Sequence, residues 1–158
     1  MTAVYLGLGS NIQPEHYIEL GIHKLNEMFD VRAVSPWYRS QSQGFDGPNF
    51  INLVVEIEYE GELQTLAAAI KQLEYECGRE AGAVKFSSRT LDIDILLFGG
   101  VVGKIAGMEL PRTDLYQYAY VLKPLLDICP EGKDPKTGRL FSDYLPSVAQ
   151  QWLEPIAH

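Results

Sequence analysis

Two aspartates separated by one residue, Asp92 and Asp94, are the best candidates for chemistry in this sequence. Apolar residues alternate with them through residues 91–98, which predicts a strand that presents both carboxylates on one face, roughly 7 Å apart. Two carboxylates so close repel each other unless a cation joins them. Such oxygen ligands suit Mg²⁺, which takes one or two carboxylates and completes its shell with water and substrate phosphate. The spacing is also typical of a solvent-facing edge strand with two exposed acids.

Other residues have the chemistry that a phosphorylated ligand would need. Arg79, Lys85 and Arg89 precede the acid pair, and guanidinium groups bind phosphate oxygens well. Phe50 and Asn52 lie on one face of another predicted strand and place an aromatic plane beside an amide. The alternatives are structural: Arg79 as a helix cap, Lys85 as a solvated charge, and Phe50 as the edge of the core.

Composition excludes several classes of function. The 158 residues include 21 acidic and 13 basic side chains, and the net charge of −8 disfavours nucleic acid as a partner. There is no GxxxxGK[ST] motif, so a nucleotide would be held without a P-loop. Cys77 and Cys129 form no CxxC pair, which indicates a reduced compartment. Without a basic N-terminal region or a long apolar run, we expect a cytoplasmic protein with no membrane partner.

Hydrophobic periodicity predicts the elements that must position these residues. Strands are expected at 3–8, 31–39, 50–59 and 91–98, and helices at 14–29, 63–77 and 119–128. The order predicts an α+β fold with a ferredoxin-like βαββαβ core, in which an antiparallel sheet carries both helices on one face. A helical or irregular C-terminal extension follows, and residues 1–158 are expected to form one domain.

This plan predicts where the candidate residues meet. If both helices cover one face of the sheet, the other face is open, and Asp92 and Asp94 share it with Phe50 and Asn52. In the strand at 50–59, the face that includes Val54 is therefore expected to be largely in solvent. Pro36 indicates an edge position or a bulge within the strand at 31–39.

Several segments together resemble the 6-hydroxymethyl-7,8-dihydropterin pyrophosphokinase family. The resemblance rests on YLGLGSN at 5–11, SPWYR at 35–39, NFIN at 49–52 and, above all, RTLDIDILLFG at 89–99. It continues through LP at 110–111 and VLKPL at 121–125, so it spans nearly the whole chain.

The resemblance implies a reaction and a role for each matching residue. The family transfers pyrophosphate from ATP to the hydroxymethyl oxygen of a reduced pterin, in the route to folate, and uses two Mg²⁺ ions. Its partners are these small molecules, with no obligate protein partner. The matching positions are catalytic Arg79, Arg89, Asp92 and Asp94, of which the two aspartates bind metal; nucleotide-binding Glu74, Lys85, Ile95 and Arg112; and pterin-binding Gln43, Phe50, Asn52 and Tyr120, the last as the stacking aromatic.

The departures from the family pattern leave an alternative open. Within residues 79–89, Ala81 and Gly82 stand where basic residues are usual, while Arg112 replaces a histidine and Tyr118 a common arginine. Fewer basic residues would weaken binding of the triphosphate. The alternative is a paralogue that binds pterin or nucleotide with weak or no pyrophosphoryl transfer. A ferredoxin-like interaction domain is a third hypothesis, but it leaves the acid pair unexplained.

Overall fold

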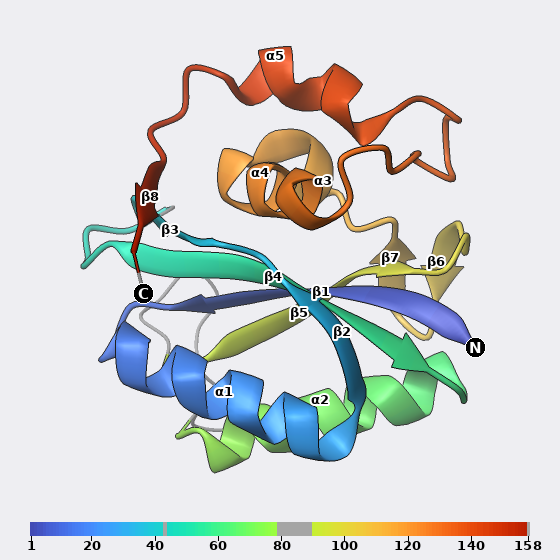
Figure 1. Cartoon of the computed structure of the whole chain (residues 1–158), viewed down its shortest axis with the longest axis horizontal. Helices are drawn as coiled ribbons and strands as arrows, with labels where there is room; N and C mark the ends of the chain where they lie inside the picture. Colours follow the sequence, from blue (N-terminus) through green and yellow to red (C-terminus); the bar gives the residue numbers. More distant parts are fainter. Residues whose placement is uncertain (43, 79–89, 158) are drawn as a thin grey trace.

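A six-stranded antiparallel sheet that includes β1 (Thr2–Ser10) organises the molecule (Figure 1). The computed structural model describes residues 1–42, 44–78 and 90–157. β1 pairs with β4 (Phe50–Tyr59) on one side and with β5 (Asp92–Phe98) on the other. The three strands therefore bring the NFIN segment and the acid pair to opposite sides of the same central strand.

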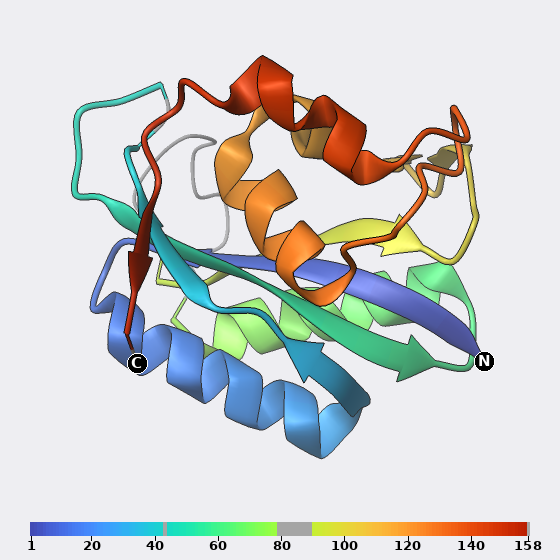
Figure 2. The ribbon, with the colours of Figure 1, turned by 45° about the horizontal axis from the view of Figure 1, so that its top comes forward.

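The strand expected at 31–39 is two strands. β2 (Asp30–Val34) and β3 (Trp37–Ser40) both pair with β4 but are separated by Ser35 and Pro36. Ser35 bridges the gap, because its Oγ accepts a hydrogen bond from the Val54 N–H at 2.9 Å. Pro36 was expected to mark an edge position or a bulge within one strand, whereas it lies in the break between two strands. Beyond β3 the sheet gains β8 (Glu154–Ile156), a strand not predicted from the sequence (Figure 2).

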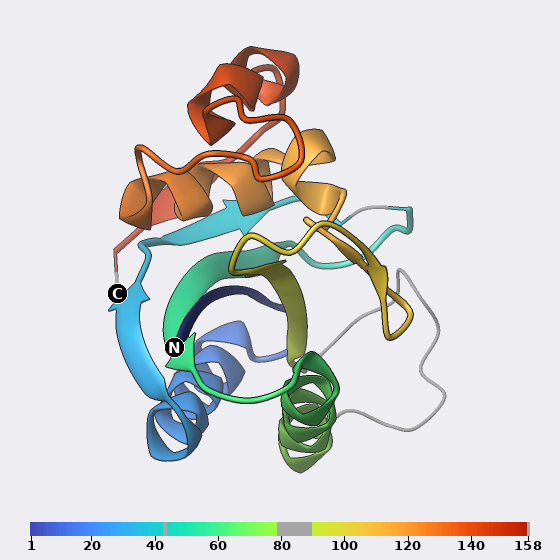
Figure 3. The same cartoon turned by 90° about the vertical axis from the view of Figure 1, so that its right-hand side faces the viewer.

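The two helices expected on one face are confirmed there. α1 (Pro14–Met28) and α2 (Leu63–Glu76) lie side by side under the curved sheet (Figure 3). Their apolar stripes pack against alternate residues of the central strands, for example Leu6, Leu53 and Ile93, each at most 5% exposed. The spacing of apolar residues, three and four apart, is sufficient to explain this layer.

We expected the opposite face of the sheet to be open, and this expectation was wrong. The C-terminal extension covers part of it. α4 (Ala119–Ile128) lies against the sheet, with α3 (Asp114–Gln117) before it and the 3₁₀ helix η1 (Phe141–Tyr144) and α5 (Leu145–Val148) after it (Figures 1 and 3). Val54, which we expected in solvent, is completely buried in a second core with Leu122 and Leu125. α4 is sandwiched between the sheet and α5, which is why it is apolar on most sides.

An irregularity in β5 adjusts the acid strand to this second layer. The register between β1 and β5 shifts at Tyr5 and Leu6, where Leu97 and Ile95 are their partners. Leu96 is the extra residue, and both Leu96 and Leu97 join the second core, although simple alternation put Leu97 on the other face. Outside this sheet, β6 (Gly103–Ile105) and β7 (Met108–Leu110) form a hairpin. In the part of the chain described here, no helix has the length and apolar character needed to cross a membrane.

Candidate active site

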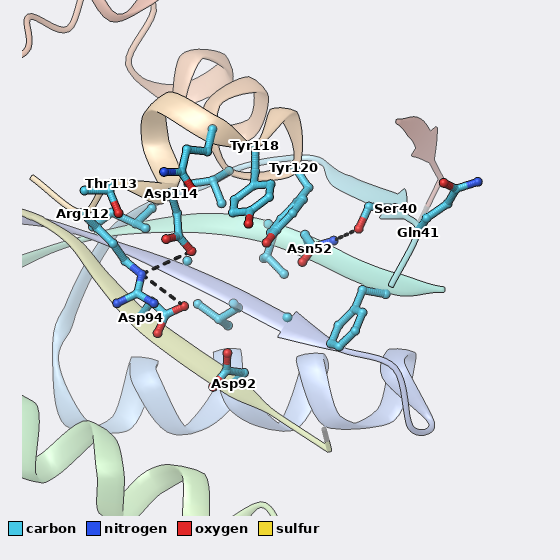
Figure 4. Close-up of a pocket in the computed structure, with 18 of the residues that line it drawn as sticks. Ser40, Gln41, Asn52, Asp92, Asp94, Arg112, Thr113, Asp114, Tyr118 and Tyr120 are labelled. Carbon is cyan, nitrogen blue, oxygen red and sulfur yellow. Dashed lines mark hydrogen bonds and ion pairs between the residues drawn. The ribbon is translucent and has the colours of Figure 1, made fainter. Parts of the chain in front are cut away.

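A cavity of about 280 Å³ lies beside the start of α4, on the sheet face opposite α1 and α2 (Figure 4). It opens where the C-terminal extension no longer covers this face. Its floor is formed by the sheet, and its far wall by the segment from Arg112 to Val121. Six of its lining residues were predicted from the sequence as site residues: Phe50, Asn52, Asp92, Asp94, Arg112 and Tyr120. Residues distant in the sequence therefore meet at one place.

Two glycines of β1 separate the chemical halves of the cavity. Gly9 pairs with Asn52 of β4 on one side and with Asp92 of β5 on the other, and Gly7 pairs with Asp94. Adjacent strands lie about 4.8 Å apart, so the backbones of Asn52 and Asp92 are separated by about 10 Å with no side chain between them. A Cβ on Gly9 would lie 3.0 Å from Asn52 Oδ1. Glycine therefore keeps the floor of the cavity open.

The first half, which we call the amide–aromatic half, consists of Phe50, Asn52, Tyr118 and Tyr120. Asn52 is only 6% exposed, and its Nδ2 donates a hydrogen bond of 2.6 Å to Ser40 Oγ. This bond fixes the orientation of the amide. A primary amide has a second N–H and a carbonyl oxygen, the groups that pair with the polar edge of a heterocycle.

Two tyrosines form the wall of this half. The rings of Tyr118 and Tyr120 are stacked, with centroids 5.0 Å apart and planes 25° apart, and both point from the start of α4 toward the sheet (Figure 4). Burial, with a smaller contribution from Asp114, raises the pKa of Tyr120 far above its ordinary value. The hydroxyl therefore stays neutral, and the wall presents uncharged aromatic surface to a planar ring.

The second half, which we call the acidic half, consists of Asp92, Asp94, Arg112 and Asp114. Arg112 Nε lies 3.6 Å from Asp94 Oδ2 and 3.4 Å from Asp114 Oδ2, which makes two ion pairs (Figure 4). The arginine backbone is anchored to β5, because its N–H donates to the Leu96 carbonyl at 2.9 Å. Among these four side chains, three carboxylates face one guanidinium.

The imbalance of charge changes the acidity of Asp94. About a third of its side chain is exposed. Burial of the rest, followed by repulsion from Asp92, raises the pKa of Asp94 to about 7, against an opposing effect of Arg112. The ionised form is therefore costly in the protein alone, and a bound cation would relieve that cost.

The donor set fits Mg²⁺ shared with a phosphorylated ligand. In residues 1–42, 44–78 and 90–157 there is no group of three or more histidine, cysteine or acidic side chains arranged around one metal position. A site made by protein alone would need such a group, but Mg²⁺ needs only one or two carboxylates when phosphate and water supply the other ligands. Asp92 and Asp94 offer those two carboxylates.

Two predicted nucleotide-binding residues lie away from the cavity lining. Glu74 of α2 is 7% exposed, and its Oε2 accepts a 2.7 Å hydrogen bond from the backbone N–H of Ile93. The side chain of Ile95 is buried in the core under α1 and α2. Both side chains thus lie on the helix-covered face of β5, and their roles in binding nucleotide stay predictions. The predicted Gln43, Arg79, Lys85 and Arg89 lie outside the described residues.

Among the lining residues that were not selected from the sequence as site residues, three carry polar groups next to the selected ones: Ser40, Asp114 and Tyr118. Ser40 contacts Asn52 because β3 pairs with β4. The register of this pairing cannot be predicted from hydrophobic periodicity. An acid like Asp114 at the first position of a helix is usually explained by the helix dipole. Tyr118 was noted only as a departure from the family pattern, although its spacing of two from Tyr120 was available.

The fold is a layered α+β fold, and the cavity has a composition that suits a ligand with a planar ring at one end and an anionic, cation-associated group at the other. The sequence model of the family described as 7,8-dihydro-6-hydroxymethylpterin-pyrophosphokinase (HPPK) matches residues 5–130. The chain belongs to this family.

Curated relatives agree with this membership. The chain is 34% identical, over 148 residues and 92% of both chains, to the 2-amino-4-hydroxy-6-hydroxymethyldihydropteridine pyrophosphokinase of Aquifex aeolicus. It is 32% identical to the enzyme of the same name from Pseudomonas aeruginosa, covering 96% of this chain and 94% of the other.

Solved structures share the fold. One is the HPPK-DHPS of Plasmodium falciparum with pteroate, which matches with a TM-score of 0.72 at 13% identity. The match covers 93% of this chain but only 42% of that longer chain. At this identity the likeness concerns the fold, a mixture of helices and antiparallel sheet.

Proposed function

We propose that this protein transfers pyrophosphate from ATP to the hydroxymethyl group of 6-hydroxymethyl-7,8-dihydropterin, releasing AMP, in folate biosynthesis. The observation that carries the proposal is the pairing of Gly9 with both Asn52 and Asp92 at the floor of one cavity. This arrangement sets a ring-binding group and a carboxylate pair about 10 Å apart, in a chain of the HPPK family.

The reaction is a displacement at the β-phosphorus. The hydroxymethyl oxygen forms a bond to this phosphorus, while the bond from it to the oxygen that bridges the α- and β-phosphates breaks. AMP leaves with the bridging oxygen, and the proton of the hydroxyl group is released. Such a transfer needs alignment of the reacting oxygen, stabilisation of charge and exclusion of water, with little covalent chemistry by the protein.

The amide–aromatic half holds the pterin in this proposal. Asn52, fixed by Ser40, pairs with the polar edge of the heterocycle, and Phe50 and Tyr120 contact its faces. Gln43 completes the set that the resemblance implies. Because the ring is held flat against the floor, its hydroxymethyl arm can extend past Gly9 toward the acidic half.

The acidic half holds the triphosphate. Asp92 and Asp94 would hold two Mg²⁺ ions, which when bound neutralise charge on the transferred phosphates. Arg112 contributes a guanidinium to the same half, and Arg79, Lys85 and Arg89 are the further basic residues that the resemblance assigns to phosphate. The resemblance also assigns Glu74 and Ile95 to the nucleotide; Glu74 accepts a hydrogen bond from the N–H of Ile93, which lies between the two aspartates.

One observation favours a second candidate, a paralogue that binds pterin or nucleotide with weak or no transfer. Arg112, the basic residue that lines the described cavity, is already engaged by Asp94 and Asp114. Among the described lining residues three carboxylates stand against this one guanidinium, and their excess negative charge disfavours a triphosphate unless cations are bound. The amide–aromatic half has no such excess of negative charge, so such a paralogue would retain affinity for pterin.

A direct assay separates the two candidates. Purified protein, Mg-ATP and the hydroxymethyl dihydropterin are mixed, and AMP and the pterin pyrophosphate are quantified over time. We expect equal amounts of both products. If no AMP forms above background while calorimetry shows pterin binding, the second candidate is supported and the transfer is refuted.

The setting of this activity is part of the proposal. The strand order β5-β1-β4-β2, with α1 and α2 on one face, supports the ferredoxin-like core, and we take residues 1–158 as one domain. With a net charge of −8 and small-molecule ligands, the protein would act in the cytoplasm without nucleic acid, membrane or obligate protein partner.

A further inference from the structure

The charged contacts of Arg112 lie at one edge of its guanidinium, where the buried Nε faces two carboxylates without a hydrogen bond. Both of its ion pairs use Nε, at 3.6 Å from Asp94 and 3.4 Å from Asp114. Among the described residues, no side chain or carbonyl forms an ion pair or hydrogen bond with its two terminal nitrogens. A guanidinium held at Nε retains four N–H donors at the terminal nitrogens, and this edge can bind a phosphate through two parallel hydrogen bonds.

Asp114 is rigidly placed relative to Arg112. The two residues flank Thr113, and a turn forms because the N–H of Leu115 donates to the Arg112 carbonyl at 3.1 Å. Leu115 is completely buried in the second core, which fixes the start of α3. Since Arg112 is also bonded to Leu96 of β5, the backbones of Arg112 and Asp114 are fixed relative to each other, and their side chains start from fixed points.

We propose that Asp114 is a positioning residue that holds Arg112 by Nε, so that its terminal nitrogens face the phosphates of the nucleotide. The inference rests on the proposed function, because it names the phosphate donor as the ligand of this half. Asp94 cannot keep this position alone. As a metal ligand it would share its negative charge with a cation, and that cation would repel the guanidinium. Asp114 lies outside the pair of metal ligands and retains its attraction for Arg112.

A double-mutant cycle tests the role. Asp114→Asn keeps the shape of the side chain and removes its charge, and we expect it to raise the KM for Mg-ATP about tenfold with kcat and pterin affinity within about twofold. Arg112→Gln should have at least the same effect on KM. In the Arg112→Gln background, adding Asp114→Asn should change KM by less than about twofold, because the residue through which Asp114 acts is gone.

Binding is measured separately from turnover. Calorimetry with a non-hydrolysable ATP analogue, with and without Mg²⁺, should reproduce the same cycle in Kd. Arg112→Lys keeps the positive charge but lacks both the Nε donor and the paired terminal nitrogens, so its affinity should fall to about that of Arg112→Gln. Asp143→Asn is the matched control, since it removes one exposed acid that pairs with Arg139 at 3.9 Å, and it should leave every value unchanged.

The outcomes are distinct. If Asp114→Asn weakens analogue binding equally in both backgrounds, or weakens Mg²⁺ binding without nucleotide, Asp114 contacts the ligand or the metal itself and the positioning role is refuted. A wild-type chain that does not bind the analogue also refutes it. If the binding cycle shows coupling but no AMP is formed, the positioning role is retained and the proposed transfer fails. Circular dichroism and thermal melts verify that each variant is folded.

Discussion

The amide–aromatic half and the acidic half of the cavity are built on neighbouring strands but held in different ways. Asn52 is fixed by a short hydrogen bond to Ser40, and Tyr120 by stacking on Tyr118. Asp94 is instead held among like charges, with Arg112 as its opposite charge. One half is made of neutral side chains, whereas the described side chains of the other half carry excess negative charge.

Under the proposed function, this difference indicates how each half would recognise its ligand. A preorganised neutral surface binds a flat, uncharged ring with little rearrangement, and loses affinity in proportion to the contact removed. An excess of carboxylates binds a polyphosphate only together with cations, so its affinity depends on metal and pH. Variants of the carboxylate pair in the acidic half should therefore affect turnover, whereas variants in the amide–aromatic half should affect the binding of one substrate.

The largest effect is expected for Asp94→Ala. Removal of one carboxylate of the pair leaves Asp92 as the remaining metal ligand and removes charge stabilisation worth several kcal/mol in the transition state. We expect kcat to fall by about 1,000-fold or more, while pterin affinity changes little. Product formation is followed under saturating substrates, and a circular dichroism spectrum verifies the fold. Asp30→Ala, which removes an exposed acid paired with Arg32 on β2, is the control. Activity near that of the wild type in Asp94→Ala would refute the assignment of metal to this residue.

Asn52→Ala should weaken pterin binding by the amide–aromatic half and leave the acidic half unchanged. The lost amide leaves polar atoms of the heterocycle unpaired in a buried place, at a cost of about 1–3 kcal/mol, so pterin Kd should rise about 10- to 100-fold. ATP affinity should stay within about twofold. Both constants are obtained by calorimetry. Similar losses for both ligands would show that the two halves are not separable.

The halves themselves could be predicted from the sequence only in part. Alternation along residues 91–98 placed Asp92 and Asp94 on one face, as the structure has them in the cavity. Their proximity to Asn52 depends on the strand order β4-β1-β5, which came from the fold plan and not from any local pattern. Local periodicity describes single elements, whereas the cavity is made by their pairing.

The second layer was beyond what alternation can predict. Val54 is buried because α4 lies over it, and Leu97 joins that core because of the irregularity at Leu96. Both follow from tertiary packing of the C-terminal extension. The contact between Arg112 and Asp114 depends on a turn and a four-residue helix, too short to leave a periodic signal. Long, regular elements were predictable, and short ones that complete the site were not.

Gly9→Ala should have a smaller effect, located between the halves. The new Cβ would lie 3.0 Å from Asn52 Oδ1, so the amide must shift by a few tenths of an ångström from its place beside Ser40. We expect pterin Kd to rise by about three- to tenfold, less than for Asn52→Ala, because the amide is displaced but retained. Gly100→Ala is the matched control, since a Cβ there meets no atom within 4 Å. If Gly9→Ala weakened ATP binding more than pterin binding, the amide would not be the group it disturbs.

The smallest effect is a pH dependence of stability that belongs to the acidic half. The pKa of Asp94 is about 7 in the folded protein and has its ordinary value of 3.8 when unfolded. Between these values the folded state binds the proton that the unfolded state has lost. Protons therefore favour folding, and this residue lowers the free energy of unfolding as pH rises from about 4 to about 7.

Asp94→Asn makes this effect measurable, because the amide resembles the protonated acid and does not titrate. With a chelator present, the variant should melt a few degrees above the wild type at pH 8, and the two should converge toward pH 5. Asn52→Ala, in the neutral half, should differ from the wild type by the same amount at both pH values. A constant offset for Asp94→Asn would mean that the carboxylate is already stabilised without a cation. The contrast between the two halves would then be one of shape and not of charge.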